Sequence, residues 1–152
     1  MLKISKADYD LIRWEAERSY PQECCGIILG SAADEARTVS LTLTCENMRS
    51  DAASNRYSID PGRVIAALKL ARSRSESIIG FYHSHPDHPP QYSSTDLLEA
   101  HWSDCSYVIT SVFKGKAQAT RSFVLLGSEE QKGFQEEPIE LLSFERSLPI
   151  AL

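Results

Sequence analysis

Residues 80–86 read Gly-Phe-Tyr-His-Ser-His-Pro, and this stretch constrains the structure more than any other part of the chain. The run over residues 77–83 is mainly apolar, as expected of a buried strand. Side chains of a strand alternate between the two faces of its sheet, so His83 and His85 project from the same face. Pro86 ends the strand because it has no N–H to donate to a neighbour. The sequence therefore predicts two imidazoles side by side at a strand end.

A carboxylate follows at a position that suits a metal site. Ten residues separate His85 from Asp96, which lies near the start of a predicted helix and so has a rigid base. Zinc favours imidazole nitrogen and carboxylate oxygen in a four-coordinate site, and a catalytic site keeps one position for water. We therefore expect His83, His85 and Asp96 to bind one zinc ion per chain. Iron or cobalt would accept the same ligands.

Two further residues suit a hydrolytic metal site, which needs a general base and a donor for the developing oxyanion. Glu23 directly precedes a buried strand and is the candidate base, and Ser93, three residues before Asp96, is the candidate oxyanion donor. Each has a simpler interpretation when taken alone. Ser93 can be a helix cap and Glu23 a solvated charge, and a His-x-His pair also occurs by chance. The combination of all these residues favours a catalytic site.

The rest of the chain predicts alternating helices and strands. Ser5 can cap a first helix, and the pair Asp60-Pro61 is typical of a helix start. We expect helices over residues 5–19, 60–73 and about 93–102, strands over 24–30, 37–45, 77–83, 107–113 and 117–126, a long loop over 46–58, and a last edge strand within 134–142. The predicted fold class is α+β, with a mainly antiparallel or mixed sheet flanked by helices.

Length and composition indicate one folded domain. The chain has 152 residues, of which 42% are hydrophobic and 24% charged, so it can bury a core and is too apolar to be disordered. We expect a single domain over residues 1–152, with a core of about 1–126 and a C-terminal extension over 127–152. The net charge of −5 argues against nucleic acid as a partner. The mild basic cluster at Lys69, Arg72 and Arg74 is better explained as a solvated helix end.

Features that would direct the chain to a membrane or to the outside are not seen in the sequence. Residues 1–8 lack the apolar core of a signal peptide, and no run of about 18 apolar residues predicts a membrane span. We expect a cytoplasmic protein with no membrane partner. The cysteines match no zinc-knuckle or Cys-x-x-Cys spacing, so we interpret them as small apolar residues in strands rather than as redox or metal groups. They are Cys24, Cys25, Cys45 and Cys105.

The site residues resemble the motif of one known family. The string His-Ser-His-Pro at residues 83–86, followed by Ser93 and Asp96, is similar at every position to the JAMM motif of the JAMM/MPN+ metallopeptidases. Residues 21–30, Pro-Gln-Glu-Cys-Cys-Gly-Ile-Ile-Leu-Gly, resemble the strand that carries the family's glutamate. The resemblance covers about residues 1–126. It implies the JAMM/MPN fold, which is similar to that of cytidine deaminases.

The resemblance also implies roles for individual residues. His83, His85 and Asp96 correspond to the family's zinc ligands, Glu23 to the residue that activates water, and Ser93 to the serine that assists the tetrahedral intermediate. Family members are metallopeptidases that cut after the C-terminal Gly-Gly of ubiquitin or ubiquitin-like proteins. The chain looks most like the small, free-standing bacterial members, which process ubiquitin-like sulfur carriers in cysteine biosynthesis. The ten residues between His85 and Asp96 leave no room for the insertions that grip polyubiquitin.

Three alternatives compete with this interpretation. A deubiquitinase-like isopeptidase would use the same site on another substrate, and a non-catalytic MPN scaffold or binding module would keep the fold without the chemistry. A zinc-dependent nucleobase deaminase needs His-x-Glu and a Pro-Cys-x-x-Cys string. Here His85 stands where that glutamate would be, and the sequence has no Cys-x-x-Cys, which excludes that class. His88 and His101 fall outside the motif and are interpreted as a surface residue and a structural residue.

Overall fold

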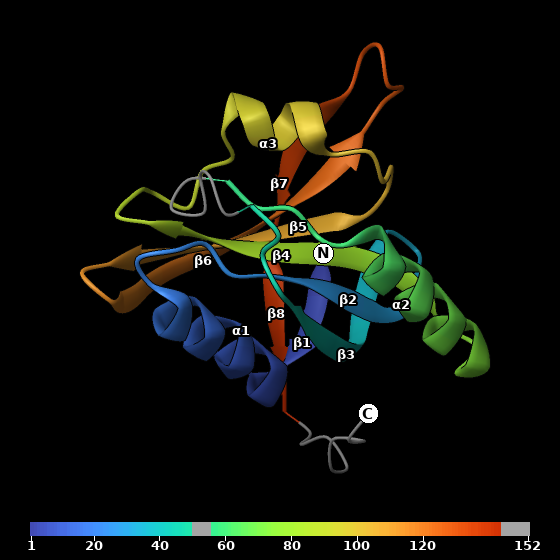
Figure 1. Ribbon diagram of the computed structural model, residues 1–152. Coiled ribbons are helices and arrows are strands. Elements are labelled where there is room, and N and C mark those ends of the chain that lie inside the picture. Colours follow the sequence, from blue (N-terminus) through green and yellow to red (C-terminus); the bar gives the residue numbers. More distant parts are fainter. Residues whose placement is uncertain (50–55, 144–152) are drawn as a thin grey trace.

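The structure is a computed structural model that describes residues 1–49 and 56–143 (Figure 1). Within these residues, three helices accompany one eight-stranded sheet with the strand order β7-β6-β5-β4-β2-β3-β1-β8. In chain order the elements are β1 (Leu2–Ser5), α1 (Lys6–Ser19), β2 (Cys25–Ala33), β3 (Ala36–Cys45), α2 (Pro61–Ser73), β4 (Ser77–Pro86), α3 (Ser94–Glu99), β5 (Ser106–Phe113), β6 (Lys116–Leu126), β7 (Gly133–Glu137) and β8 (Ile139–Leu142). No helix in this part of the chain is long and apolar enough to cross a membrane.

The sheet is mixed, which confirms the predicted α+β class. The hairpins β2–β3 and β5–β6 are antiparallel, as are the pairs β2–β4 and β6–β7. Strands β4 and β5 run parallel because α3 and the turns around it carry the chain back over the sheet. Strand β1 is parallel to both of its neighbours, β3 and β8.

The helices start where the sequence predicts. The Ser5 hydroxyl accepts a hydrogen bond from the Asp8 N–H at 3.1 Å and caps α1, and the Asp60 carboxylate accepts from the Gly62 N–H at 3.0 Å and caps α2. Pro61 occupies the first position of α2, where its missing N–H costs nothing. Local capping therefore accounts for the beginning of both long helices.

Several boundaries differ from the prediction. Strand β1 was not expected, because four residues are too few to show an alternating pattern. Strand β4 continues through Pro86 rather than ending near residue 83, since it pairs with β5 over residues 80–86. Helix α3 ends at Glu99, and the expected edge strand within residues 134–142 is two strands separated by Pro138. Residues 50–55 of the predicted loop and 144–152 of the predicted extension lie outside the described residues.

Two apolar cores cover the two faces of the sheet. Alternation along the strands directs Ile28 and Tyr82 towards α1, where they pack with Ile12. The neighbouring side chains Ile27 and Phe81 point to the other face, under α2. Each fully buried large side chain contributes about 1.5–3 kcal/mol to folding. The position of Phe81 fixes which face of β4 carries His83, two residues further along.

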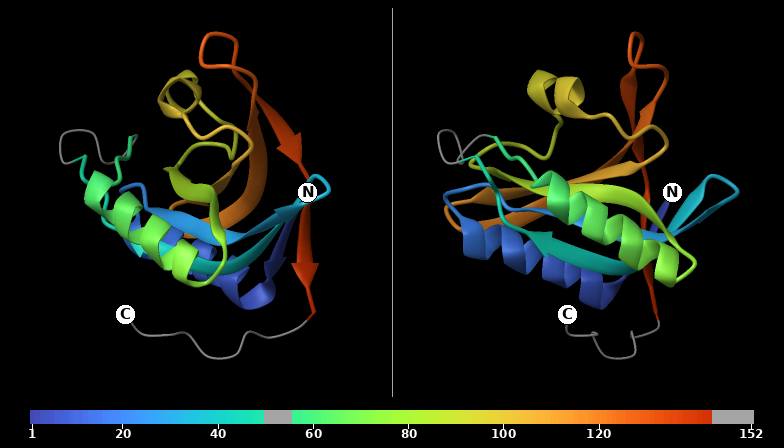
Figure 2. Two further views of the ribbon diagram at one scale, coloured as in Figure 1. Left: turned by 90° about the vertical axis from the view of Figure 1, so that its right-hand side faces the viewer. Right: turned by 45° about the vertical axis from the view of Figure 1, so that its right-hand side comes forward.

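The sheet curls so that a single segment reaches both of its ends (Figure 2). Strand β7 pairs with β6 at one end of the strand order, and β8 pairs with β1 at the other. Only Pro138 separates the two strands, and its carbonyl accepts a hydrogen bond from the Leu2 N–H at 2.9 Å. The sheet is thus nearly closed.

A buried ionic cluster supports this junction. The Arg37 guanidinium donates to Glu137 Oε1 at 2.8 Å, and the hydroxyls of Ser106 and Ser122 donate to Glu137 Oε2 at 2.6 and 2.9 Å. Both charged side chains are more than nine-tenths buried. Burial alone would raise the pKa of Glu137, but these hydrogen bonds outweigh it and hold the pKa below its ordinary value.

Candidate metal centre

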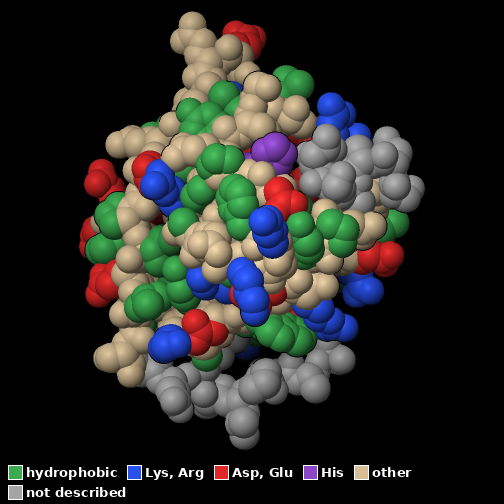
Figure 3. Space-filling view, turned by 90° about the vertical axis from the view of Figure 1, so that its left-hand side faces the viewer, with side chains coloured by type: hydrophobic (Ala, Val, Ile, Leu, Met, Phe, Trp, Pro, Cys, Tyr) green, Lys and Arg blue, Asp and Glu red, His purple; other side chains and the backbone are tan. Residues whose placement is uncertain are grey.

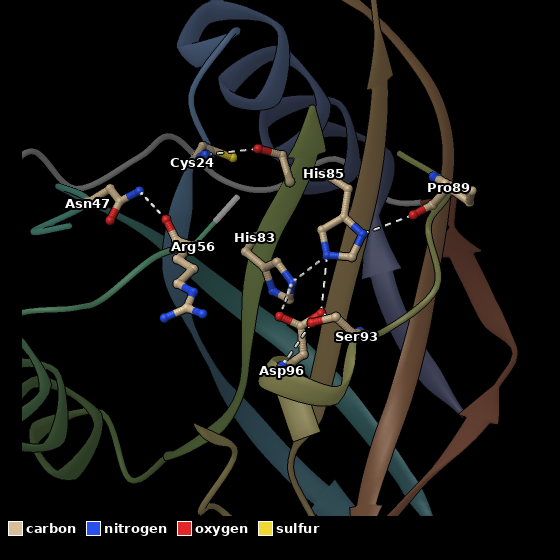
Figure 4. A network of polar contacts seen from close by, with 9 residues as sticks. Cys24, Asn47, Arg56, His83, His85, Pro89, Ser93 and Asp96 are labelled. Atoms are coloured by element: carbon tan, nitrogen blue, oxygen red, sulfur yellow. Dashed lines mark hydrogen bonds and ion pairs between the residues drawn. The ribbon is translucent and has the colours of Figure 1, made fainter. Parts of the chain in front are cut away.

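Three side chains predicted as ligands meet at one point at the end of β4 (Figure 4). His83 Nε2 lies 3.2 Å from His85 Nε2 and 3.3 Å from Asp96 Oδ1, and His85 Nε2 lies 3.2 Å from Asp96 Oδ2. A tetrahedral zinc site with bonds of about 2.0–2.1 Å has ligand–ligand edges of about 3.3–3.4 Å. Each of these distances is close to such an edge, although Asp96 approaches the two rings through different carboxylate oxygens, and these residues fit the ion.

The backbone orients the His85 ring for this purpose. His85 Nδ1 donates to the Pro89 carbonyl at 2.9 Å, and because a carbonyl only accepts, the proton must be on Nδ1. The Nε2 lone pair is then left for a metal. Burial lowers the pKa of His85, but its hydrogen bond with Asp96 outweighs this effect and raises the pKa above the ordinary value.

His83 is held differently. Its side chain is 1% exposed, and burial lowers its pKa. Among the buried side-chain nitrogen and oxygen atoms of the described residues, His83 Nδ1 is the only one without a hydrogen-bond partner. The Tyr57 ring stacks on the imidazole, with 4.5 Å between ring centroids and 23° between the planes.

The start of α3 positions the carboxylate. The Ser93 N–H donates to Asp96 Oδ2 at 2.7 Å, and the Asp96 N–H donates to Ser93 Oγ at 3.0 Å, which together form a capping box. Burial alone would raise the pKa of Asp96. The hydrogen bonds from His83, His85 and the Ser93 backbone outweigh it and hold the pKa well below the ordinary value. Asp96 is therefore a carboxylate at neutral pH.

Glu23, two residues before the start of β2, also lies beside the two histidines. It is 3% exposed, and a carboxylate oxygen lies within 4.8 Å of ring nitrogens of both His83 and His85. Glu23 could also be counted as a ligand on this spacing, but Asp96 contacts both rings directly at 3.2–3.3 Å. These shorter contacts favour Asp96 as the third ligand, with Glu23 beside the centre. Burial, with a smaller contribution from Asp96, raises the pKa of Glu23 to about 8.

Two pockets flank the histidine pair. One, of about 280 Å³, lies on the side of Glu23 and Ser93, and the other, of about 270 Å³, lies on the side of Tyr57 and Phe81. The first is lined by Glu23, His85, Pro86, His88, Pro89, Gln91 and Ser93. The second is lined by Arg49, Tyr57, Ser58, Ile59, Phe81, Glu99, His101, Trp102 and Tyr107.

The surface around the centre is mixed in character. On the face shown in Figure 3, acidic and basic side chains are interspersed with apolar ones, and a histidine side chain reaches the surface. His88 is exposed, as predicted, and also lines the pocket that contains Glu23 and Ser93. His101 is exposed and pairs with Glu129 at 3.0 Å. All four cysteines are free thiols, three of them buried.

The structure brings all five predicted site residues together. Sequence patterns gave no indication of Tyr57, which approaches His83 from a loop without regular structure. They also missed Asn47, whose amide hydrogen-bonds the loop and the Glu23 backbone. The only indication in the sequence was that Asn47 and Tyr57 lie near the two ends of the long loop predicted over residues 46–58.

Comparison with known proteins identifies the family of the chain. The family model described as prokaryotic homologs of the JAB domain matches residues 5–126. A desampylase from Haloferax volcanii is 34% identical over 91 residues, which are 60% of this chain and 63% of that protein, so the match spans less than two thirds of the relative. A CysO-cysteine peptidase from Mycobacterium tuberculosis is 23% identical over 127 residues, 84% of this chain and 82% of that one.

Solved structures share the whole fold. The solution structure of a protein from Desulfitobacterium hafniense has a TM-score of 0.79 and 27% identity, and covers 97% of this chain and 95% of its own. The solution structure of a protein from Salinibacter ruber has a TM-score of 0.70 and 33% identity, with 96% and 95% covered. The similarity therefore includes the strands and helices beyond the metal centre.

Proposed function

Because the chain belongs to the family of prokaryotic homologues of the JAB domain, we propose that it is a zinc-dependent peptidase. Its substrate is the bond after the C-terminal Gly-Gly of a ubiquitin-like protein. The observation that carries the proposal is the cluster of His83, His85 and Asp96, whose side chains contact one another at 3.2–3.3 Å, with the buried carboxyl of Glu23 beside it. The names of two relatives, a desampylase and a CysO-cysteine peptidase, support a hydrolase of small-protein conjugates.

His83, His85 and Asp96 would hold the zinc ion, one per chain. When bound, zinc supplies a Lewis acid that polarises the scissile carbonyl and lowers the pKa of coordinated water to about 7. The hydrogen bond from His85 to the Pro89 carbonyl keeps that ring in the tautomer that can bind. The ionised Asp96 supplies the negative charge that offsets part of the charge of the cation.

Glu23 is the general base in this mechanism. It takes the proton of the attacking water and returns it to the leaving amine. Burial raises the pKa of Glu23 to about 8, so it can both accept and release a proton near neutral pH. A nearby divalent cation would oppose this rise and favour the carboxylate form that the first step needs.

Ser93 stabilises the oxyanion that forms on the substrate carbonyl. Its hydroxyl oxygen accepts a hydrogen bond from the Asp96 N–H, which leaves the hydroxyl hydrogen to donate towards the pocket shared with Glu23. The capping box fixes Ser93 relative to Asp96, so donor and proposed ligand keep one geometry. A donor held in this way needs no reorganisation during the reaction.

The substrate tail passes the centre in an extended form. Glycine has no side chain, so a Gly-Gly tail can approach the backbone of β4 and α3 closely on its way between the two pockets. The short connection between His85 and Asp96 favours a small sulfur-carrier substrate with a cysteine or short extension after Gly-Gly. The free thiols agree with the reducing cytoplasm that we propose as its location.

Mass spectrometry of two matched substrates tests this proposal. A ubiquitin-like carrier with a single cysteine after Gly-Gly, and the same carrier joined through Gly-Gly to the lysine side chain of a peptide, are incubated with the zinc-loaded protein. We expect release of cysteine from the first substrate at the higher rate. Faster cleavage of the second would favour the isopeptidase alternative. Cleavage of neither would refute the peptidase and favour a binding module.

A further inference from the structure

The side chain of Asn47 makes four hydrogen bonds, all to backbone groups. Its Nδ2 donates to the carbonyls of Glu23 at 3.2 Å and Arg56 at 3.0 Å, and its Oδ1 accepts from the N–H groups of Arg49 at 3.0 Å and Ser58 at 3.1 Å. An amide side chain offers two donor hydrogens and two lone pairs, so the hydrogen-bonding capacity of Asn47 is fully used. Figure 4 shows the bond to Arg56.

These bonds fix the backbone on both sides of Tyr57. Arg56 and Ser58 are its direct neighbours, and each gives one backbone group to the Asn47 amide. A further bond, from the Met48 N–H to the Ser58 carbonyl at 2.9 Å, joins the two arms of the loop. The backbone on both sides of Tyr57 is therefore held by Asn47.

The Tyr57 ring packs directly against the imidazole of His83. The two imidazoles of the centre are restrained by different means, because His85 has the Pro89 carbonyl whereas His83 Nδ1 has no hydrogen-bond partner. A proposed ligand without an outer hydrogen bond needs another restraint on its ring angle. The Tyr57 ring, stacked on it at 4.5 Å, is that restraint.

We infer that Asn47 and Tyr57 are positioning residues of the metal centre, with Asn47 setting the Tyr57 ring and Tyr57 setting the His83 ring. This inference rests on the proposed function for its catalytic meaning. The same Asn47 amide also holds the Glu23 carbonyl. One side chain thus fixes a proposed ligand and the proposed base relative to each other.

The geometric part can be tested on the metal-free protein by NMR. A stacked tyrosine shifts the ring protons of His83 upfield, and this shift does not depend on metal or on catalysis. We expect it to persist in Tyr57→Phe, which keeps the ring, and to be lost in both Tyr57→Leu and Asn47→Ala. Ser122→Ala is the matched control, because it also removes one buried hydrogen bond, in the Glu137 cluster on β6, which is two strands away from β4. An unchanged His83 shift in Asn47→Ala would overturn the inference.

Measurements of zinc affinity and turnover test whether the positioning of His83 matters for metal binding and catalysis. Loss of an outer restraint on a ligand typically lowers metal affinity or activity about 10- to 100-fold. We expect a loss of this size in zinc affinity for Tyr57→Leu and Asn47→Ala, little change for Tyr57→Phe and Ser122→Ala, and no further loss when Asn47→Ala is added to Tyr57→Leu. Full additivity would contradict an action of Asn47 through Tyr57.

The two failures can be told apart. If the wild-type protein shows the His83 shift but neither binds zinc nor cleaves any conjugate, the proposed function fails and the positioning of the ring stands. If the wild type binds zinc and cleaves its substrate while all the variants keep wild-type affinity and rate, the positioning role fails and the proposed function stands.

Discussion

Ser93 and Asp96 exchange hydrogen bonds in both directions, from the Ser93 N–H to the Asp96 carboxylate and from the Asp96 N–H to the Ser93 hydroxyl oxygen. The proposed oxyanion donor and a proposed metal ligand are therefore parts of one helix cap. The simple interpretation of Ser93 as a cap and the catalytic one are compatible, because capping uses a lone pair of the hydroxyl and catalysis uses its hydrogen.

Replacing Ser93 by glycine should separate the two roles. Glycine is an acceptable N-cap, so Ser93→Gly should lose only a few tenths of a kcal/mol of stability. Without the hydroxyl donor, kcat should fall about 10²- to 10³-fold. Unfolding in urea and steady-state cleavage measure the two effects, with Ser94→Ala as the neighbouring control. A variant as active as wild type would show that the hydroxyl serves only as a cap.

Replacing Glu23 by glutamine should stop proton transfer and leave the proposed ligands in place. We expect Glu23→Gln to keep one zinc per chain and to lose about 10²- to 10⁴-fold in kcat, the usual contribution of a general base. Metal analysis and the cleavage assay provide the test. Glu140→Gln, which changes an exposed residue of β8, should behave as wild type. Undiminished cleavage by Glu23→Gln would favour a different base.

Removing the metal should destabilise the protein. Zinc at a free concentration a hundredfold above its Kd would add about 2.7 kcal/mol to the free energy of unfolding. A chelator should therefore lower the melting temperature of the wild type. His85→Ala should abolish this response, whereas His88→Ala, a histidine of the same loop region outside the cluster, should retain it. Equal responses from both variants would speak against His85 as a ligand.

Stability below neutral pH should depend on Glu137. Its pKa lies below the ordinary value in the folded protein, so the carboxylate stabilises the fold fully above the unfolded-state pKa of about 4.3. This contribution is lost as the pH falls through the lower folded-state pKa. Glu137→Gln should cost about 2–3 kcal/mol at pH 7 and should flatten the acid side of the stability profile.

The control for this profile is the adjacent Glu136→Gln. Glu136 is half-exposed and pairs only loosely with Arg121, at 3.7 Å, so its removal should cost little. Urea unfolding between pH 7 and about pH 3 provides the comparison. Identical pH profiles for Glu137→Gln and wild type would show that the buried cluster does not control acid stability.

Local patterns in the sequence were sufficient for much of the fold and for the candidate site. Alternation in β4 predicted that His83 and His85 share a face, and capping residues predicted the starts of α1 and α2. These features depend only on neighbours along the chain. The parallel strand β1 could not be predicted, because its four residues are held by pairing with β3 and β8, which are distant in sequence.

The same distinction applies inside the site. The motif indicated the five central residues, but the spacing of their atoms depends on how β4, α3 and the approach to β2 meet. Tyr57 and Asn47 were missed because stacking on His83 and bonding to the Glu23 carbonyl are tertiary contacts. Neither residue type carries such a role by itself, so only the folded chain reveals it.

The segment that spans Pro138 has a consequence for the order of folding. Strand β1 precedes the other described elements in the chain, and it obtains one of its two partners only when β8 has been synthesised. Until then that side of β1 presents unpaired backbone groups, a state prone to mispairing with other chains. Synthesis through β8 must therefore precede closure of the sheet, so that β1 waits for the last of the described strands before both of its sides are covered.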